Sequence, residues 1–272
     1  MQAEVRRLEI IDILSESDKG IVSIRDLARR LGVSEMTVRR DLDWLAERSI
    51  LNRVHGGAIA YSSNQEKPFL DRTRQANPQK IAVGWTAAHL VKDGEKLLLD
   101  AGTTAQQVAR HLAEKSNLTV ITNNLYVAGE LSQYPAIETI VLGGNIKHQE
   151  NCTIGPIAKQ ELSIFSVDKY FLSASGFSLR QGITDHDLRE VEIKQAMMRA
   201  AKEIILVADS TKWDVVNLIK ICNLKDIHIL VTDDEFPSQV IGELENQGIT
   251  VFTPERLASQ IVRSSYQKKG AS

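Results

Sequence analysis

Residues 23–47 read SIRDLARRLGVSEMTVRRDLDWLAE, and this stretch decides the fold of the first part of the chain. Ser23 comes just before apolar residues at helical spacing, with Asp26 three positions later, which is a variant of the helix capping box. Gly32 interrupts the helical pattern, and Ser34 is the expected cap of a further helix that extends to about Glu47. Two short helices joined by a three-residue turn that contains glycine predict a helix-turn-helix motif.

The second of these helices has two different sides. At roughly 100° per residue, Val38, Leu42 and Leu45 share one side and are expected to face the core. The opposite side has polar and basic residues early in the helix and acidic residues late, which suits a helix whose N-terminal half enters a DNA groove. An ordinary solvated helix face would show the same charges, so both interpretations stay open. The early residues of this side are Met36, Thr37, Arg39 and Arg40.

The segments on both sides of the motif complete a domain. Residues 5–14 predict a helix whose buried stripe includes Val5. Residues 50–60 predict a hairpin or wing, with its turn at His55 and the glycines that follow. We therefore expect a winged helix-turn-helix domain over residues 1–60.

The composition of the whole chain restricts its class. At 272 residues two domains are expected, and a content of 43% hydrophobic and 25% charged residues excludes a disordered or fibrous protein. The net charge of −2 gives no overall attraction to nucleic acid, so binding to DNA must come from a local face. No apolar run approaches the roughly 18 residues of a membrane span, and the N-terminus lacks a signal-peptide pattern. With Cys152 and Cys222 expected as free thiols, these features predict a cytoplasmic protein without a membrane segment.

The chain changes character near residues 61–79, which carry Pro68 and Pro78 and are expected to form a linker. Beyond them, short apolar runs alternate with helix-period segments, which predicts an α/β domain with a mainly parallel sheet over residues 80–255. A C-terminal helix and a frayed tail are expected over residues 256–272. The expected strands are 96–100, 118–122, 138–142, 169–173, 204–208, 227–231 and 250–252.

The loop after the first of these strands is the most informative. The segment DAGTT at 100–104 ends the strand and begins a helix, so Gly102, Thr103 and Thr104 lie at a helix N-terminus. Free amides and the helix dipole predict an anion site there, with the two hydroxyls as further donors. The alternative is that Thr103 only caps the helix and that Asp100 bonds to the turn.

Small and polar residues also follow the other expected strands. Because the carboxyl ends of parallel strands meet at one edge of a sheet, these residues together predict a site for a phosphate or a polyol. Glu190 and Lys194 lie one helical turn apart, between two of these strands. The alternative to a role in the site is that they form only an exposed ion pair. The residues after the strands are Thr122, Asn123 and Asn124, then Gly143 and Gly144, then Gly176, and finally Asp209 and Lys212.

Motifs of the common catalytic classes are missing from the sequence. It has no glycine-rich dinucleotide loop, no P-loop, no nucleophile elbow and no HExxH helix, so we expect no cofactor. Asp185, His186 and Asp187 are of metal-ligand types, but adjacent residues rarely point at one ion. A loop with a surface histidine is the preferred interpretation, and no metal is expected.

Two groups of motifs resemble a known family. The segment SEMTVRRDL at 34–42, followed by RVHGGA at 53–58, strongly resembles the DNA-binding segment of the DeoR-type bacterial repressors of sugar catabolism. DAGTT at 100–104, TN at 122–123, LGG at 142–144, GP at 155–156 and DSTK at 209–212 resemble the sensor domain of that family, in the same order. The resemblance covers nearly the whole chain. It implies a winged helix-turn-helix joined to an α/β sensor domain related to ribose phosphate isomerase and coenzyme A transferase folds.

The resemblance also implies a function. The protein would repress a carbohydrate catabolic operon by binding double-stranded operator DNA, and a phosphorylated sugar or polyol would release it. We expect a homodimer or homotetramer, because paired half-sites need paired reading helices. The alternative is a sugar-phosphate isomerase-like enzyme with an appended DNA-binding domain, in which Glu190 or Glu192 would be the base and Lys194 the stabilising cation.

The expected site residues follow from these motifs and from the resemblance. The DNA-binding candidates are Ser34, Glu35, Met36, Thr37, Arg39, Arg40, Arg53 and His55. The effector-binding candidates are Asp100, Gly102, Thr103, Thr104, Thr122, Asn123, Asn124, Gly143, Gly144, Gly176, Thr184, Lys194, Asp209 and Lys212.

Overall fold

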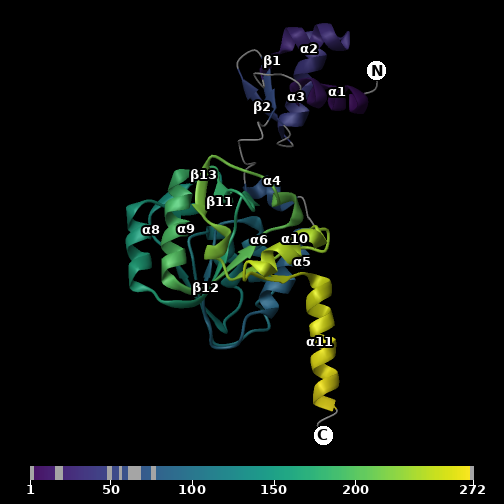
Figure 1. Cartoon of the computed structure of the whole chain (residues 1–272). Coiled ribbons are helices and arrows are strands. Elements are labelled where there is room, and N and C mark those ends of the chain that lie inside the picture. Colours follow the sequence, from purple (N-terminus) through teal and green to yellow (C-terminus); the bar gives the residue numbers. More distant parts are fainter. Residues whose placement is uncertain are drawn as a thin grey trace. The chain divides into compact units, whose positions relative to one another are not determined.

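The computed structural model describes residues 3–15, 21–47, 51–54, 57–60, 69–74 and 78–269, which belong to two compact units (Figure 1). The first unit extends from Met1 to Arg72 and the second from Thr73 to Ser272. Within the expected linker 61–79, Phe69–Arg74 forms a short helix, α4, and the side chain of Phe69 is buried. This part of the expected linker is therefore helical, because burial of an apolar side chain stabilises it.

The first unit combines helices with a small antiparallel sheet. Its elements are α1 (Ala3–Ser15), β1 (Ile21–Ser23), α2 (Ile24–Leu31), α3 (Glu35–Glu47), β2 (Leu51–Val54) and β3 (Gly57–Ala60). At the start of α2, Ser23 Oγ accepts a hydrogen bond from the Asp26 amide at 3.1 Å, and Gly32 ends the helix in the left-handed conformation. Strand β3 pairs with both β2 and β1, so the predicted hairpin is confirmed and carries an additional strand.

The core of this unit joins all three helices. Ile10 and Leu14 of α1, Leu27 of α2 and Leu42 of α3 are each at most 1% exposed. The expected stripe of α1 is wrong at Val5, which is 48% exposed. The helix buries a side that includes Ile10 and Leu14, four positions apart, and this spacing places both side chains on one face.

The second unit is built on a seven-stranded sheet in which every neighbouring pair is parallel. The predicted parallel sheet is confirmed, and the bounds of its strands differ from the expected ones by at most three residues. In the sheet the strands follow the order β15-β14-β12-β9-β4-β5-β6. They are β4 (Lys96–Leu99), β5 (Leu118–Thr122), β6 (Ile137–Val141), β9 (Val167–Leu172), β12 (Ala201–Val207), β14 (Ile229–Val231) and β15 (Thr250–Phe252).

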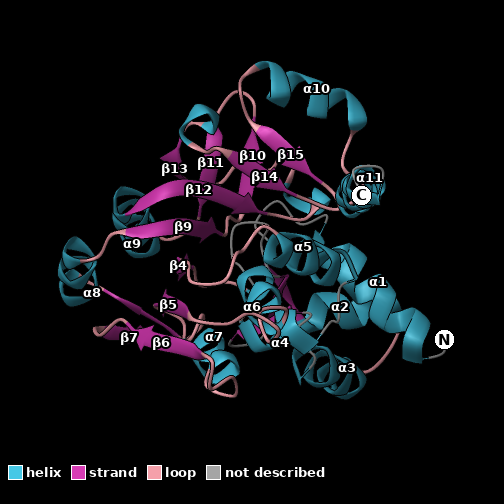
Figure 2. Cartoon of the chain, turned by 90° about the horizontal axis from the view of Figure 1, so that it is seen from below, coloured by secondary structure: helices cyan, strands magenta, loops and turns pink. Residues whose placement is uncertain are grey.

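Helices cover both faces of this sheet (Figure 2). They are α5 (Pro78–His89), α6 (Thr103–Arg110), α7 (Leu125–Leu131), α8 (Pro156–Glu161), α9 (Leu188–Ala200) and α10 (Ser238–Asn246). Successive residues of one strand enter different cores: Leu98 packs in the cluster that holds Met197 of α9, whereas Leu97 and Leu99 pack in the cluster that holds Val83 of α5. Burial on both faces explains why the strands read as continuous apolar runs.

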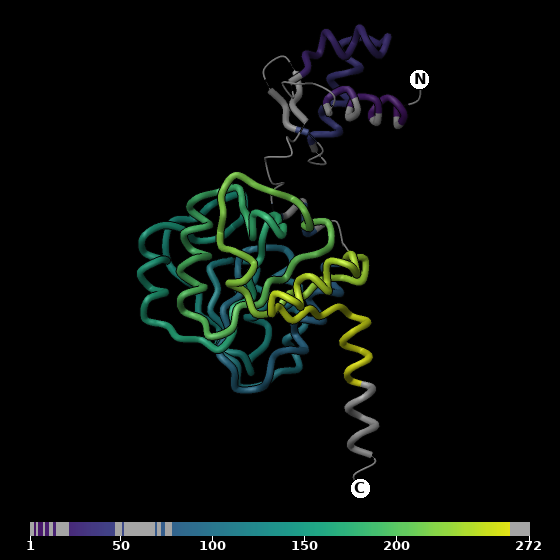
Figure 3. Tube along the Cα trace, in the orientation of Figure 1, coloured from purple at the N-terminus to yellow at the C-terminus, as the bar shows by residue number. Residues whose placement is uncertain are grey.

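The order in which successive strands are added to the sheet reverses between β4 and β9, which are themselves parallel. From β4 the chain continues through β5 to β6 at one edge, and it then returns to β9 on the other side of β4 before reaching β12, β14 and β15 (Figure 3). In open parallel sheets, ligands bind beyond the carboxyl ends of the strands where the order reverses. The residues that follow β4 and β9 are therefore the first to consider.

Two small antiparallel sheets follow strands of the large sheet. One is the hairpin of β7 (Asn145–Lys147) and β8 (Cys152–Ile154), and the other joins β10 (Gly176–Ser178), β11 (Gly182–Asp185) and β13 (Ile219–Cys222). The sequence predicted loops there, because several of these short strands include glycine or polar residues and do not form apolar runs. These sheets continue directly from β6 and β9, so they extend the polypeptide beyond the carboxyl edge of the large sheet.

The C-terminal segment is more helical than expected. Helix α11 extends from Pro254 to Lys269, so most of the expected frayed tail is helical, and residues 270–272 lie outside the described residues. Leu257 in its first turn is 7% exposed, and the helix contacts α5 of the second unit.

Candidate functional site

Helix α3 has the two sides that the sequence predicted. Val38, Leu42 and Leu45 are at most 1% exposed, while Met36 is 60% exposed and Arg40 is exposed. The predicted division into a core face and an outer face is therefore confirmed. The other DNA-binding candidates of this segment are also accessible: Ser34, Glu35 and Arg39 are exposed, and Thr37 is half-buried.

Ser34 and Thr37 also stabilise the start of α3. Ser34 Oγ accepts a hydrogen bond from the Thr37 amide at 3.2 Å, and the two hydroxyls lie 2.9 Å apart. The predicted cap is confirmed. Of the two remaining DNA-binding candidates, Arg53 lies in β2 and His55 lies outside the described residues.

Asp41 is a residue of α3 that sequence reasoning missed. It is 2% exposed, and its carboxylate accepts from Arg6 Nε at 2.5 Å and from Arg7 Nε at 3.0 Å. The guanidinium of Arg7 also lies 3.9 Å from the ring centroid of Trp44. These contacts join the outer helix α1 to α3, so they fix the direction in which the exposed face of α3 points.

In the second unit, Asp100 and Lys194 form a buried ion pair at the point where the strand order reverses. Lys194 Nζ lies 2.7 Å from Asp100 Oδ2 and donates to Ser173 O at 3.0 Å, and Asp185 Oδ2 is 3.5 Å away. Asp100 also accepts from the amides of Ala101 and Ser173 at 2.7 and 2.9 Å. Burial alone would lower the pKa of Lys194, but Asp100 and Asp185 outweigh it and raise the pKa. The pair therefore holds β4, β9 and α9 together.

The N-terminus of α6 begins directly beyond this pair. Its N-cap is Gly102, which has no side chain to bond the first amides of the helix, while Thr103 and Thr104 are 5% and 7% exposed. Thr103 therefore does not cap the helix, whereas the other part of that alternative is confirmed, because Asp100 bonds to the turn through the Ala101 amide. A Cβ atom on Gly102 would come within 2.8 Å of Ser173 Oγ, so the hydroxyl of Ser173 lies against the start of α6. Uncapped amides of a first helical turn attract anions.

Buried polar atoms without a hydrogen-bond partner gather at this edge. Such an atom costs free energy unless a ligand or water satisfies it. Four of them belong to residues that follow β4, β5, β9 and β12, which are neighbours in the sheet. They are Gln106 Oε1, Asn123 Oδ1, Ser173 Oγ and Asp209 Oδ2.

Asn123 and Asn124 attach the β7–β8 hairpin to the end of β5. Asn123 Nδ2 donates to Thr153 O at 3.0 Å, and Asn124 Nδ2 donates to Glu150 O at 2.9 Å. Asn124 Oδ1 caps α7 by accepting from the amides of Tyr126 and Val127. Thr122 Oγ1 accepts from the Asn124 amide at 3.1 Å. Thr122 and Asn124 are thus satisfied within the protein, whereas Asn123 keeps an open acceptor.

The remaining effector-binding candidates have close structural contacts. The Gly143 amide donates to Glu161 Oε2 at 2.7 Å, and a Cβ on Gly144 would come within 2.7 Å of Ile154 O. Gly176 and Thr184 are paired in the small sheet, where Thr184 Oγ1 donates to Gly176 O at 3.2 Å. Asp209 is 1% exposed and caps a short 3₁₀ turn that ends at Lys212, which is half-buried.

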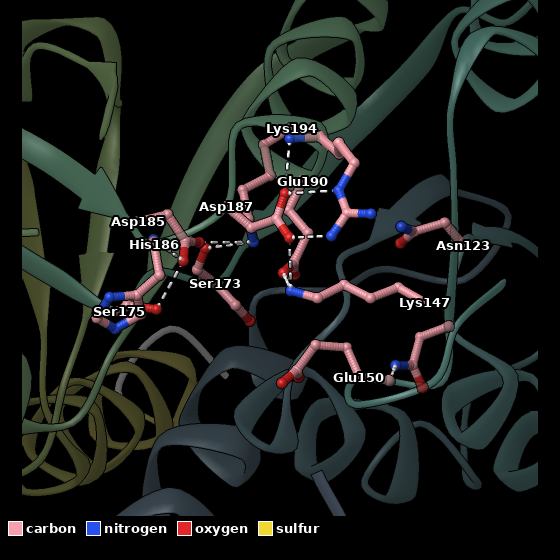
Figure 4. A network of polar contacts seen from close by, with 12 residues as sticks. Asn123, Lys147, Glu150, Ser173, Ser175, Asp185, His186, Asp187, Glu190 and Lys194 are labelled. Atoms are coloured by element: carbon pink, nitrogen blue, oxygen red, sulfur yellow. Dashed lines mark hydrogen bonds and ion pairs between the residues drawn. The ribbon is translucent and has the colours of Figure 1, made fainter. Parts of the chain in front are cut away.

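Lys147 and Glu190 form a second buried ion pair that the sequence did not reveal (Figure 4). The Lys147 side chain is 13% exposed, and its ammonium contacts Glu190 and lies 3.2 Å from Asp187 Oδ2. Glu190 therefore does not form the exposed pair with Lys194 that the sequence allowed. Burial raises the pKa of Glu190, against the opposing effect of Lys194 and Lys147.

A metal site, a disulfide bond and a membrane-spanning helix are not found among the described residues. Within those ranges, no group of three His, Cys, Asp or Glu side chains could hold a metal ion. Cys152 and Cys222 are both free and buried, and burial raises the pKa of the Cys222 thiol to about 12. No helix in the described part of the chain is both long enough and apolar enough to cross a membrane.

A helix-turn-helix unit with an exposed reading face, joined in one chain to a separate α/β unit, defines a DNA-binding regulator with a sensor domain. The DeoR-like helix-turn-helix domain matches residues 6–64, and the DeoR C terminal sensor domain matches residues 75–234. The chain belongs to the DeoR family of transcriptional regulators.

Relatives of known name agree with this assignment. The chain is 32% identical to the HTH-type transcriptional regulator GolR of Listeria innocua, over 92% of this chain and 98% of that protein. It is 31% identical to the Glycerol-3-phosphate regulon repressor of Haemophilus influenzae, over 91% of this chain and 95% of that protein. It is also 32% identical to the HTH-type transcriptional repressor CsqR of Escherichia coli, over 88% and 92% of the two chains. The family and these relatives are transcriptional regulators, so the protein is a DNA-binding transcriptional regulator, and the isomerase-like alternative has no support among them.

Similarity to solved structures is low. Ribose 5-phosphate isomerase A of Methanocaldococcus jannaschii gives a TM-score of 0.37 at 20% identity, over 49% of this chain and 53% of that one. The delta subunit of eIF2B from Chaetomium thermophilum gives 0.41 at 13% identity, over 84% and 70% of the two chains. Similarity at this level concerns the fold alone.

Proposed function

We propose that this protein is the repressor of a carbohydrate catabolic operon and that a phosphorylated sugar or polyol releases it from its operator. The effector binds beyond the carboxyl ends of β4, β5, β9 and β12. Helix α3 reads the operator in the major groove through its exposed face, with Arg39 and Arg40 as cations near the middle of the helix.

The group of unpartnered buried polar atoms carries the effector site. Asn123 Oδ1, Ser173 Oγ and Asp209 Oδ2 belong to residues that follow three strands of one sheet, β5, β9 and β12, at its carboxyl edge. A single ligand at this edge would satisfy them together. Without such a ligand, each of the three atoms would need a separate reason for being buried without a hydrogen-bond partner.

The start of α6 supplies the anion-binding part of the site. Its first amides have no side-chain cap, and the Ser173 hydroxyl beside Gly102 adds a donor. Asp100 holds this loop by accepting from the amides of Ala101 and Ser173, and Lys194 is its ion-pair partner. Since Lys194 is fully engaged with Asp100, Ser173 O and Asp185, we assign the pair a positioning role for the anion site.

Release from DNA needs a difference in affinity. The effector must bind one arrangement of a homodimer or homotetramer more tightly than another, and the favoured arrangement must separate the two α3 helices differently. Two reading helices are needed because half-sites on one face of DNA recur about every 34 Å.

A thermal-shift screen tests the proposal directly. The purified protein is heated with inorganic phosphate, with sugar and polyol phosphates, and with the same compounds without phosphate. A ligand at a hundredfold its dissociation constant adds about 2.7 kcal/mol of stability, which appears as a shift of several degrees. The Gly102→Ala variant should lose the shift from every phosphorylated compound, because the added methyl group blocks the approach to α6 and Ser173.

A matched control is Gly242→Ala in α10, where an added Cβ meets no atom within 4 Å. It should keep every shift of the wild type. If neither phosphorylated compounds nor free polyols shift the wild-type protein, the proposed effector site is wrong. Shifts from free polyols alone would remove the anion assignment and keep a carbohydrate effector.

A further inference from the structure

We propose that Lys147 and Glu190 form a second part of the effector site, which binds the hydroxyl groups at the end of the effector remote from its phosphate. This inference rests on the proposed function. It adds two residues that no motif of the sequence marks as a binding pair, and it assigns a chemical class to what they bind.

The position of Lys147 places it at the same edge of the sheet. Strand β8 of its hairpin is bonded to the end of β5, since the Thr153 amide donates to Asn123 O at 2.7 Å and Asn123 Nδ2 donates to Thr153 O. Strand β7 lies beside β8 and directs Lys147 toward the N-terminus of α9. The hairpin therefore joins the end of β5 to α9.

The chemistry of the pair favours a hydroxyl over a phosphate. The Lys147 ammonium faces two carboxylates, those of Glu190 and Asp187, so this cluster has no excess positive charge to attract an anion. A hydroxyl group is both a donor and an acceptor, so it can donate to a carboxylate while it accepts from the ammonium. Sugars and polyols carry several such groups in a row.

Two buried atoms provide independent support for a ligand here. Asn123 is 2% exposed, and because its Nδ2 already donates to Thr153 O, its unpartnered atom is the acceptor Oδ1. A hydroxyl can donate to this oxygen, whereas a phosphate dianion has no hydrogen to give. Ser173 is 8% exposed, and its hydroxyl also lacks a partner. In the view of Figure 4, Ser173 lies on the side of the Lys147 ammonium, and Asn123 lies toward the other end of the Lys147 side chain.

The arrangement gives the site two chemically different ends. Ser173 Oγ lies against the start of α6, at the anion end, and Asn123 Oδ1 lies on the segment that carries the β7–β8 hairpin. A sugar phosphate would place its phosphate at α6 and its hydroxyls toward Lys147 and Glu190.

The test compares two classes of probe on a charge-neutral double variant. Lys147→Met with Glu190→Gln removes both charges together, which avoids leaving one charge buried without its partner. The probes are inorganic phosphate and a panel of hexose 6-phosphates, pentose 5-phosphates and glycerol 3-phosphate, each titrated by calorimetry. The double variant should bind inorganic phosphate within about twofold of the wild type. It should bind the preferred sugar phosphate about tenfold or more weakly, because hydrogen bonds to charged groups are lost.

The control is the same pair of substitutions on an exposed ion pair of α8 and α9. Lys159 and Glu192 lie 3.8 Å apart with side chains 45% and 48% exposed, so Lys159→Met with Glu192→Gln should leave all affinities unchanged. If the first double variant does not fold, Glu190→Gln alone serves, since Lys147 retains Asp187 as a partner.

Two results would overturn the inference. One is a double variant that keeps its full preference for the sugar phosphate over inorganic phosphate. The other is a wild-type protein that binds no sugar phosphate more tightly than inorganic phosphate. In both cases binding of inorganic phosphate itself would leave the proposed effector site standing, whereas a wild-type protein that binds neither class removes the site and the inference together.

Discussion

Two glycines of the sensor unit have opposite surroundings, and alanine should therefore affect them in opposite ways. A Cβ on Gly176 would collide with the backbone oxygen of Val215, whereas a Cβ on Gly129, inside α7, meets no atom within 4 Å. We expect Gly176→Ala to lower the free energy of unfolding by about 1–3 kcal/mol through overpacking. Gly129→Ala should raise it by about 0.5–1 kcal/mol, because alanine loses less backbone entropy in a helix. Urea unfolding of both variants measures the difference, and equal effects would contradict the packing at Gly176.

Arg40 is the residue on which operator binding should depend most directly. Its side chain is exposed on the face of α3 opposite the buried Val38 and Leu42, so Arg40→Ala should leave the thermal midpoint within about 1 °C, in line with a surface substitution. Binding to a duplex that the wild type selects from a random DNA pool should fall by at least about fivefold, as expected for loss of a base or phosphate contact of about 1–3 kcal/mol. A gel-shift titration measures this.

The control for Arg40 is Arg180→Ala, which removes the same charge from an exposed turn of the sensor unit. Its affinity for the duplex should be that of the wild type. An unchanged affinity in Arg40→Ala would exclude Arg40 from the DNA contacts.

Single residues show what the sequence could and could not predict about the sites. The outer face of α3 and the loop after β4 were predictable, because helical spacing and a glycine at a helix start are local patterns. The ion pair of Asp41 with Arg6 joins residues 35 positions apart, and that of Lys147 with Glu190 joins residues 43 positions apart. No local pattern marks such partners, so Asp41 looked like one more charge on a charged helix.

At the scale of elements, the start of α9 provides a prediction about pH. Asp187 caps this helix by accepting from the Arg189 amide at 2.9 Å, and its carboxylate pairs with the Arg189 guanidinium and with Lys147. The hydrogen bond from the Arg189 side chain, with further help from the Arg189 amide and Lys147, holds the pKa of Asp187 well below its usual range. The folded state therefore binds the proton less readily than the unfolded state.

This depressed pKa stabilises the folded protein above pH 4, roughly the pKa of an unfolded aspartate, and the stabilisation is lost as the pH falls further. Asp187→Asn keeps the cap but removes the charge, so it should cost about 1 kcal/mol at pH 7 and progressively less below pH 4. Urea unfolding from pH 7 to pH 3 measures the difference from the wild type, with the exposed Glu243→Gln in α10 as the control. A difference that stays constant with pH would mean that the Asp187 charge does not stabilise α9.

The elements also show where sequence patterns are sufficient. All seven strands of the large sheet were expected, because each is buried between two layers of helices and so reads as an apolar run. The strands β7, β10 and β11 were not, because each includes glycine or polar side chains and so does not read as an apolar run. Of these strands, β11 also pairs with β13, which lies far along the chain. The hairpin that carries Lys147 belongs to this unpredicted class.

At the scale of the whole molecule, the two units have separate cores, and the proposed DNA-reading face and the proposed effector site belong to different units. The core of the first unit joins Ile10, Leu27 and Leu42, and the cores of the second join strands to α5, α6 and α9. The effector and the operator must therefore influence each other through the free-energy difference between two arrangements of the protein, which both ligands change. Contact between the two ligands is not required, because each only has to prefer a different arrangement of the protein.

The effects of the effector on operator affinity and of the operator on effector affinity should be equal in size. If the effector weakens operator binding by a certain factor, the operator must weaken effector binding by the same factor, because both follow from one coupling free energy. We expect a factor of roughly 5–150, the usual range of such coupling. Calorimetric titration of the effector with and without saturating duplex gives one factor, and fluorescence anisotropy of the duplex with and without effector gives the other. Arg40→Ala provides the control, since its effector affinity without duplex should equal that of the wild type and should respond only at higher duplex concentrations. Unequal factors would mean that the effector does not act by shifting an equilibrium of the same protein that binds the operator.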